Sequence, residues 1–150
     1  MNKSLVTETP DELFDKAEKD LISVNVLLST KYYPEDRMYD IICFHATQAV
    51  EKLLKGFIIS NGKNIEKTHD LDYLQMVAMA IDNSFSKIKL NCLLLNNFIP
   101  NMRYSDANPI TKRNIVEIIK SLKMVCNFPM IKTMRDTFSK RHGYEIANIE

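Results

Sequence analysis

The fold is decided by residues 38–62, which read MYDIICFHATQAVEKLLKGFIISNG. Apolar side chains recur there at every third or fourth position, the spacing that places them on one side of an α-helix. One row comprises Met38, Ile42, Ala46, Ala49, Leu53 and Phe57, and a second row comprises Ile41, Val50, Leu54 and Ile58. So wide an apolar side is typical of a central helix that packs against several neighbours. We predict a helix from Glu35 or Asp36 to about Asn61, where Asn61-Gly62 ends it.

The segment before this helix carries a second helical pattern. Thr9 and Glu12 have the spacing of a capping box, and Pro10 occupies the first helical position, where the missing N–H has no role. Apolar residues then follow at intervals of three or four: Leu13, Ala17, Leu21, Val24 and Leu28. A helix is therefore expected to begin at Pro10 and to end before Tyr32-Tyr33-Pro34.

Three more helical patterns follow, each with apolar residues at every third or fourth position. They cover residues 68–81, 85–99 and about 110–128. Thr68 is expected to cap the first of them. Pro129 is expected to end or kink the last, after which one or two further turns form and residues 139–150 fray. The predicted fold class is all-α, an antiparallel up-and-down bundle of four to five helices.

Composition bounds the class of protein. The 150 residues, 45% hydrophobic and 26% charged, fit one globular domain that spans residues 1–150. The chain has no apolar run of about 18 residues, so we expect no membrane span. Nine charged side chains in the first 20 residues leave no room for the core of a secretory signal. Three cysteines, an odd number, fit a reducing compartment, and the expected location is the cytoplasm.

No motif for metal or cofactor chemistry occurs in the sequence. The three histidines, His45, His69 and His142, lie on separate segments, and no His-Glu-x-x-His or Cys-x-x-Cys spacing is present. The three glycines are isolated, so there is no glycine-rich phosphate loop. The net charge is +1, yet residues 110–150 hold eight bases and four acids. That surplus fits a weak contact with an anion or an ordinary solvated helix surface. We predict no metal site and no cofactor.

A polar stripe runs along the long helix opposite its apolar row. It comprises His45, Gln48, Lys52 and Lys55. Glu51 lies beside the stripe and can pair with Lys55 one turn later. One interpretation is a solvent-exposed flank stabilised by that pair, worth some tenths of a kcal/mol. The other is a shallow surface where glutamine and lysine donors meet a nucleotide or a partner chain. Spacing alone favours the first.

The same stretch carries a resemblance to a known family. Residues 44–56, FHATQAVEKLLKG, resemble the signature helix of HEPN domains, in which an aromatic residue precedes Gln-Ala-x-Glu-Lys-x-Leu-Lys. Residues 67–71, KTHDL, resemble the family's Thr-His-Asp/Glu-Leu element, and residues 103–106, RYSD, resemble its Arg-Tyr-Pro-Asp element with Ser105 in place of the proline. The resemblance covers about residues 10–126, so residues 127–150 are expected to be an additional segment.

The resemblance implies a fold and a set of partners. HEPN domains are up-and-down helical bundles, commonly homodimers, and many bind a nucleotidyltransferase encoded beside them. We therefore expect a module that binds a nucleotide or interacts with another protein and does not catalyse a reaction. The residues expected to bind a nucleotide, an RNA or the protein partner are Gln48, Lys52, Lys55, His69, Arg103 and Tyr104. Arg103 would grip a phosphate and Tyr104 would stack on a base, if both face the same cleft as the polar stripe.

Other HEPN domains are metal-independent ribonucleases that carry Arg-x(4–6)-His in the loop before the last main helix. Arg103 occupies the arginine position, but residues 108–110 are Asn, Pro and Ile, so the histidine is absent. An imidazole is needed there to move a proton during attack by the 2′-OH group. Two alternatives stay open. Arg135 and His142, followed by Tyr144, imitate the motif and would make the chain an RNA-cleaving toxin; or the domain is a dimerisation scaffold.

Overall fold

The computed structural model describes residues 4–31, 34–99 and 109–149. Within these ranges the chain is helical, with six α-helices, two short 3-10 helices and one isolated β-bridge. The helices in chain order are α1 (Pro10–Ser29), η1 (Glu35–Met38), α2 (Tyr39–Ser60), α3 (Leu71–Ile81), η2 (Asn83–Ile88), α4 (Lys89–Asn96), α5 (Lys112–Cys126) and α6 (Pro129–His142). The predicted all-α bundle is confirmed.

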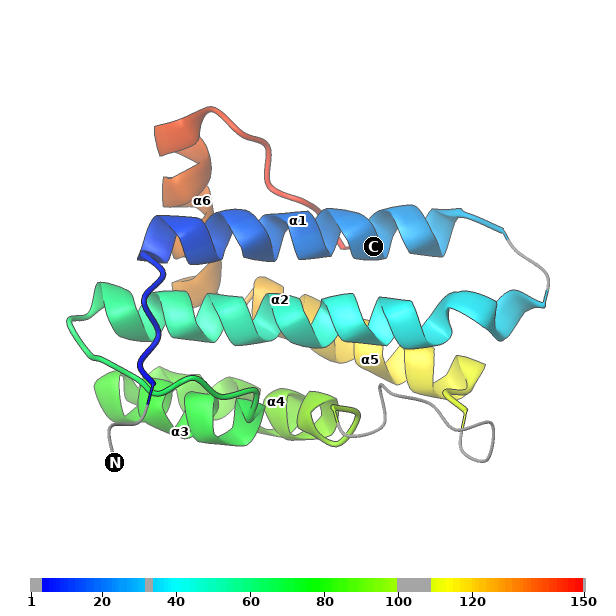
Figure 1. Ribbon diagram of the computed structural model, residues 1–150, viewed down its shortest axis with the longest axis horizontal. Coiled ribbons are helices and arrows are strands. Elements are labelled where there is room, and N and C mark those ends of the chain that lie inside the picture. Colours follow the sequence, from blue (N-terminus) through cyan, green and yellow to red (C-terminus); the bar gives the residue numbers. More distant parts are fainter. Residues whose placement is uncertain (1–3, 32–33, 100–108, 150) are drawn as a thin grey trace.

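Helix α2 is the centre of this bundle. It packs against α1 most extensively and also contacts α3, α4, α5 and α6. Figure 1 shows α1 and α2 side by side along the long axis, with α3 and α4 on the other side of α2. The wide apolar side of residues 38–62 therefore meets several neighbours, as the sequence predicts. The polar stripe, in turn, falls on the edge of α2 that α1 approaches.

The starts of α1 and α3 show which predicted caps the structure has. Thr9 caps α1 as predicted, because its Oγ1 accepts from the backbone N–H of Glu12 at 3.1 Å. The cap of α3 is Asp70 rather than Thr68: its carboxylate accepts from two backbone N–H groups of the first turn. Thr68 lies two residues earlier, and its Oγ1 accepts from the backbone N–H of Asp70 at 3.1 Å. Ionised carboxylates are strong caps at a positive helix end, which explains the shift.

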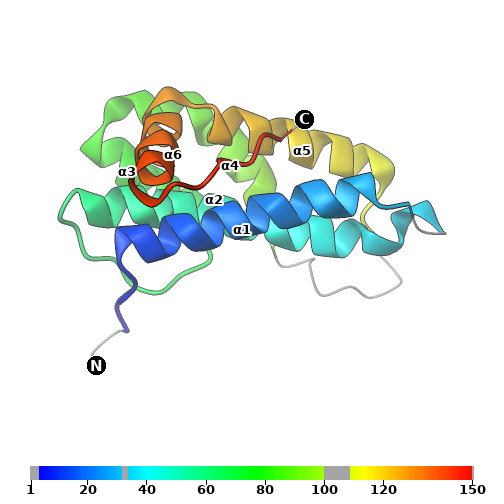
Figure 2. The same ribbon diagram turned by 90° about the horizontal axis from the view of Figure 1, so that it is seen from above.

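The C-terminal part is more ordered than the sequence suggests. Pro129 opens α6 instead of ending structure, since proline is well suited to the first helical position. Gly143 ends the helix with φ +70°, the left-handed conformation that glycine adopts without strain. Residues 143–149 then run back along α1 (Figure 2). There, Asn25 Nδ2 donates to the carbonyl of Asn148 at 2.8 Å. The expectation that residues 139–150 fray is therefore wrong for residues 139–149.

One close contact sets the spacing between the two long helices. Gly56 of α2 faces the ring of Phe14 on α1, and a Cβ atom at position 56 would lie 2.3 Å from Phe14 Cε1. Both residues are buried, and the Phe14 ring also packs edge-on against Phe138 of α6. Position 56 therefore favours glycine, because the Phe14 ring occupies the space that a Cβ atom would take.

Candidate functional site

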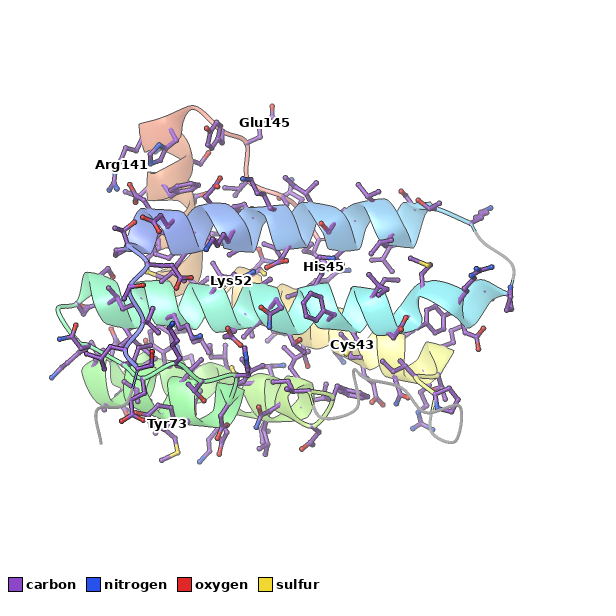
Figure 3. All side chains as sticks on the ribbon, in the orientation of Figure 1. Cys43, His45, Lys52, Tyr73, Arg141 and Glu145 are labelled. Atoms are coloured by element: carbon purple, nitrogen blue, oxygen red, sulfur yellow. The ribbon has the colours of Figure 1, made fainter. Side chains whose placement is uncertain are left out.

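Two nearly buried carboxylates organise the polar stripe. Asp20 of α1 lies between two α2 side chains: its Oδ1 is 2.8 Å from His45 Nδ1, and its Oδ2 accepts from Lys52 Nζ at 2.5 Å. Figure 3 shows His45 and Lys52 along the edge of α2 that faces α1. Each end of the Asp20 carboxylate is therefore satisfied by one group of the stripe, and this fixes the direction of the lysine.

Glu51 of α2, like Asp20, contacts one histidine and one lysine. Its Oε1 lies 2.7 Å from His69 Nδ1, and its Oε2 accepts from Lys55 Nζ at 2.9 Å. The predicted pair of Glu51 with Lys55 is confirmed. The interpretation as a solvent-exposed flank is wrong, because Glu51 is 4% and Lys55 is 7% exposed. Helix α1 and residues 4–8 cover this side of α2. The spacing of residues within α2 cannot predict that burial.

Lys52 and the Glu51 group border a pocket of about 370 Å³, which we call the lysine pocket. It is lined by Val6, Glu8, Leu13, Lys16, Gln48, Glu51, Lys52, Lys55, Lys67, Thr68 and His69. The structure thus brings together four residues that the sequence singled out: Gln48, Lys52, Lys55 and His69. Four lysines against two glutamates make the lining cationic. A lining with more bases than acids favours anions over cations.

The outer wall of the lysine pocket comes from the N-terminal segment (residues 4–8). Val6 N–H donates to the carbonyl of Ile65 at 2.9 Å, and Lys67 N–H donates to the carbonyl of Ser4 at 3.0 Å. Leu5 and Glu66 form the antiparallel bridge between them. Figure 1 shows this segment descending from the start of α1 across α2 to the connection that precedes α3. Sequence reasoning missed this wall, since so short a pairing has no strand pattern.

The remaining two predicted binding residues, Arg103 and Tyr104, lie outside the described residues. Their placement beside the lysine pocket stays a prediction. The absence of a histidine at residues 108–110 is a property of the sequence, and of these positions the structure describes Pro109 and Ile110.

The residues of the ribonuclease alternative have separate partners. Arg135 is 2% exposed, and its guanidinium makes a two-pronged ion pair with Glu18 of α1 at 2.6 and 3.1 Å. It also donates to the carbonyls of Cys126 and Ala147 at 3.2 and 2.8 Å. Burial disfavours the charged guanidinium and so lowers the pKa of Arg135. The hydrogen bonds to Glu18 and the negative charge of Glu18 outweigh this effect, so the pKa lies above its ordinary value. Four of five guanidinium N–H donors are thus engaged inside the protein.

His142 lies at the surface end of α6 instead. Its Nε2 is 3.0 Å from Oδ2 of Asp11, a carboxylate that also accepts from Arg141 at 2.7 and 2.9 Å. The hydrogen bond from His142, helped by Arg141, lowers the pKa of Asp11. The His142 and Tyr144 rings stack with centroids 6.0 Å apart. In this arrangement His142 links α6 to the start of α1, whereas Arg135 is buried against Glu18.

The three cysteines are free and buried, and burial raises the pKa of each thiol to about 12. They are therefore unreactive members of the core. In the part of the chain that the structure describes, no three His, Cys, Asp or Glu side chains are grouped as a metal site would require. None of the described helices is long and apolar enough to cross a membrane.

Comparison with known proteins completes the description. No curated protein and no solved structure matches this chain. The HEPN domain family matches residues 11–133. These residues extend from the first turn of α1 into the first turns of α6. They include all residues of α1 and α2 that line the lysine pocket, together with residues 67–69. The match covers most of the chain and contains the signature-like residues 44–56. The chain therefore belongs to the HEPN domain family.

Proposed function

We propose that this HEPN protein binds a phosphate-bearing ligand, a nucleotide or an RNA, in the lysine pocket and does so without catalysis. One observation carries the proposal: Gln48, Lys52, Lys55 and His69, chosen from the sequence, line one cationic pocket. A nucleotide- or RNA-related role is what membership in the HEPN family supports. The pocket volume, about 370 Å³, lies within the range of small-ligand sites.

The geometry of the pocket favours binding over chemistry. Asp20 and Glu51 each hold a lysine and a histidine in place, so the side chains are ordered before a ligand arrives. Preorganisation of this kind lowers the entropic cost of binding. The family's ribonuclease histidine is missing from residues 108–110, and Arg135 is engaged with Glu18. Both observations support a non-catalytic module.

The proposal includes protein partners. The family resemblance supports a homodimer that acts together with a nucleotidyltransferase-type protein. In this view the lysine pocket receives a nucleotide or an RNA end that the partner uses or modifies. A small nucleotidyltransferase encoded next to this chain would support this part of the proposal. The additional segment 127–150 is proposed to brace α1 rather than to form a second domain, since α6 and residues 143–149 pack on α1.

Replacing Gln48 by glutamate tests the binding proposal. Gln48→Glu keeps the size of the side chain and adds a negative charge to the lining, so we expect binding of ATP, GTP or a short RNA to weaken about tenfold. Isothermal titration calorimetry at low salt measures the affinity, and the same samples incubated with RNA should leave it intact. Asn83→Asp, an exposed position on η2 outside the pocket, makes the same charge change and should bind as the wild type does.

Two results would refute the proposal. One is a wild-type protein that binds none of the three ligands. The other is equal affinity in Gln48→Glu and Asn83→Asp, which would place the ligand elsewhere.

A further inference from the structure

We infer that Lys16 and Lys67, rather than Lys52 and Lys55, contact the phosphate, and that Glu8 competes with that phosphate for Lys16. The inference rests on the proposed function, since it concerns the same pocket. It assigns roles to three residues that the signature-like motifs leave without one.

Lys52 and Lys55 are already engaged by internal carboxylates. Their ammonium groups lie 2.5 and 2.9 Å from Asp20 and Glu51, and their side chains are only 19% and 9% exposed. Moving either lysine to a ligand would leave a nearly buried carboxylate without its cation, which is strongly unfavourable. These two lysines therefore build the pocket floor and hold its shape.

Lys16 and Lys67 are the two lysines of the lining that remain available. Lys67 is exposed and has no ion pair among the described residues. Lys16 is 51% exposed at its side chain, and its Nζ lies 3.5 Å from Oε2 of Glu8. Charge-assisted hydrogen bonds are usually near 2.7–2.9 Å, so the contact with Glu8 is a loose one. A flexible ammonium with a loose partner can turn to a phosphate at little cost.

Glu8 is placed to act as an internal substitute for the ligand. It follows the paired residues 4–6 and directly precedes Thr9, the cap of α1, so its backbone is fixed at the pocket rim. Its side chain is 31% exposed and needs only rotation about its own bonds to leave Lys16. While it faces Lys16, it reduces the positive charge that a ligand meets. A phosphate with more negative charge than one carboxylate would displace it.

Matched charge changes test the inference with inorganic pyrophosphate and ATP as probes. Glu8→Gln should bind each probe about three- to tenfold more tightly, because the competing charge is gone. Lys16→Gln and Lys67→Gln should each bind about fivefold or more weakly. The control variants carry the same charge changes outside the pocket: Glu12→Gln in the first turn of α1, and Lys19→Gln, whose partner is Asp15. Titration calorimetry measures the affinities, and thermal unfolding checks that each variant is folded.

The outcomes separate this inference from the proposed function. Tighter binding by Glu8→Gln but not by Glu12→Gln, with weaker binding by both pocket lysine variants than by Lys19→Gln, supports it. If the wild type binds and Gln48→Glu weakens binding while the Glu8, Lys16 and Lys67 variants match their controls, the inference is overturned and the proposed function stands. If the wild type binds none of pyrophosphate, ATP, GTP and a short RNA, both are overturned.

Discussion

Replacing Arg135 by methionine is expected to lower the free energy of unfolding by about 3–5 kcal/mol. Methionine preserves much of the volume but leaves Glu18, 7% exposed, without its cation. The carbonyls of Cys126 and Ala147 lose a donor as well. Breaking a buried pair is costly because the desolvated carboxylate stays behind. Chemical denaturation followed by circular dichroism measures the change.

Arg141→Met is the matched control for this experiment. It removes an arginine from the same helix whose ion pair with Asp11 is exposed, with side chains 57% and 36% accessible. Exposed pairs contribute about 0.2–1 kcal/mol, so this variant should stay close to the wild type. Equal losses in Arg135→Met and Arg141→Met would contradict the role given to the Arg135–Glu18 pair.

A cleavage assay on the ribonuclease alternative should use His142→Ala, since loss of activity in an Arg135 variant would also follow from unfolding.

Gly56→Ala is expected to destabilise the protein by about 1–3 kcal/mol, even though alanine favours a helix by about 1 kcal/mol over glycine. The added methyl group would lie 2.3 Å from Phe14 Cε1 and 2.9 Å from two further ring atoms. The ring cannot move aside freely, because Phe14 is 6% exposed and packs against Phe138. Helices α1 and α2 must therefore separate, or the ring must leave its position.

A double-mutant cycle gives this prediction a sharper readout. In a Phe14→Leu background the smaller side chain leaves room for the methyl group, so Gly56→Ala should cost less there than in the wild type. Thermal or denaturant unfolding of the four proteins measures the coupling. Additive effects of the two substitutions would show that position 56 does not depend on the Phe14 ring.

Local signals predicted the helices well, because capping and periodicity act within one helix. Thr9 with Glu12 set the start of α1, and the apolar row through Ala46 and Leu53 fixed α2 as the centre of the bundle. The errors at Thr68 and Pro129 are local, since they concern which residue begins a helix. The error at residues 139–149 arose because a neighbouring segment decides the outcome. Residues 139–149 are ordered because Arg135 and Glu18, 117 positions apart, hold them against α1. No spacing rule pairs charges over such a distance.

Only part of the candidate site could be predicted from the sequence, because some of its residues come from other segments of the chain. Gln48, Lys52 and Lys55 share one side of α2, so helical spacing alone groups them, and the motif-like residues 67–71 add His69. Their buried partner Asp20 comes from another helix, and Glu8 comes from a segment without a helical pattern. Burial of Glu51 and Lys55 depends on how α1 lies over α2, which the sequence of α2 does not contain.

The central claim is that the phosphate-bearing ligand occupies the lysine pocket. Two-dimensional NMR of the isotope-labelled protein, titrated with ATP at low salt, tests it most directly. We expect saturable shifts of the backbone amides of Gln48, Lys67 and His69, with little change at Met134 and Arg141, which line a larger pocket of about 610 Å³ beside α6. Shifts confined to the surroundings of Met134 and Arg141, or none at saturating ATP, would contradict the claim.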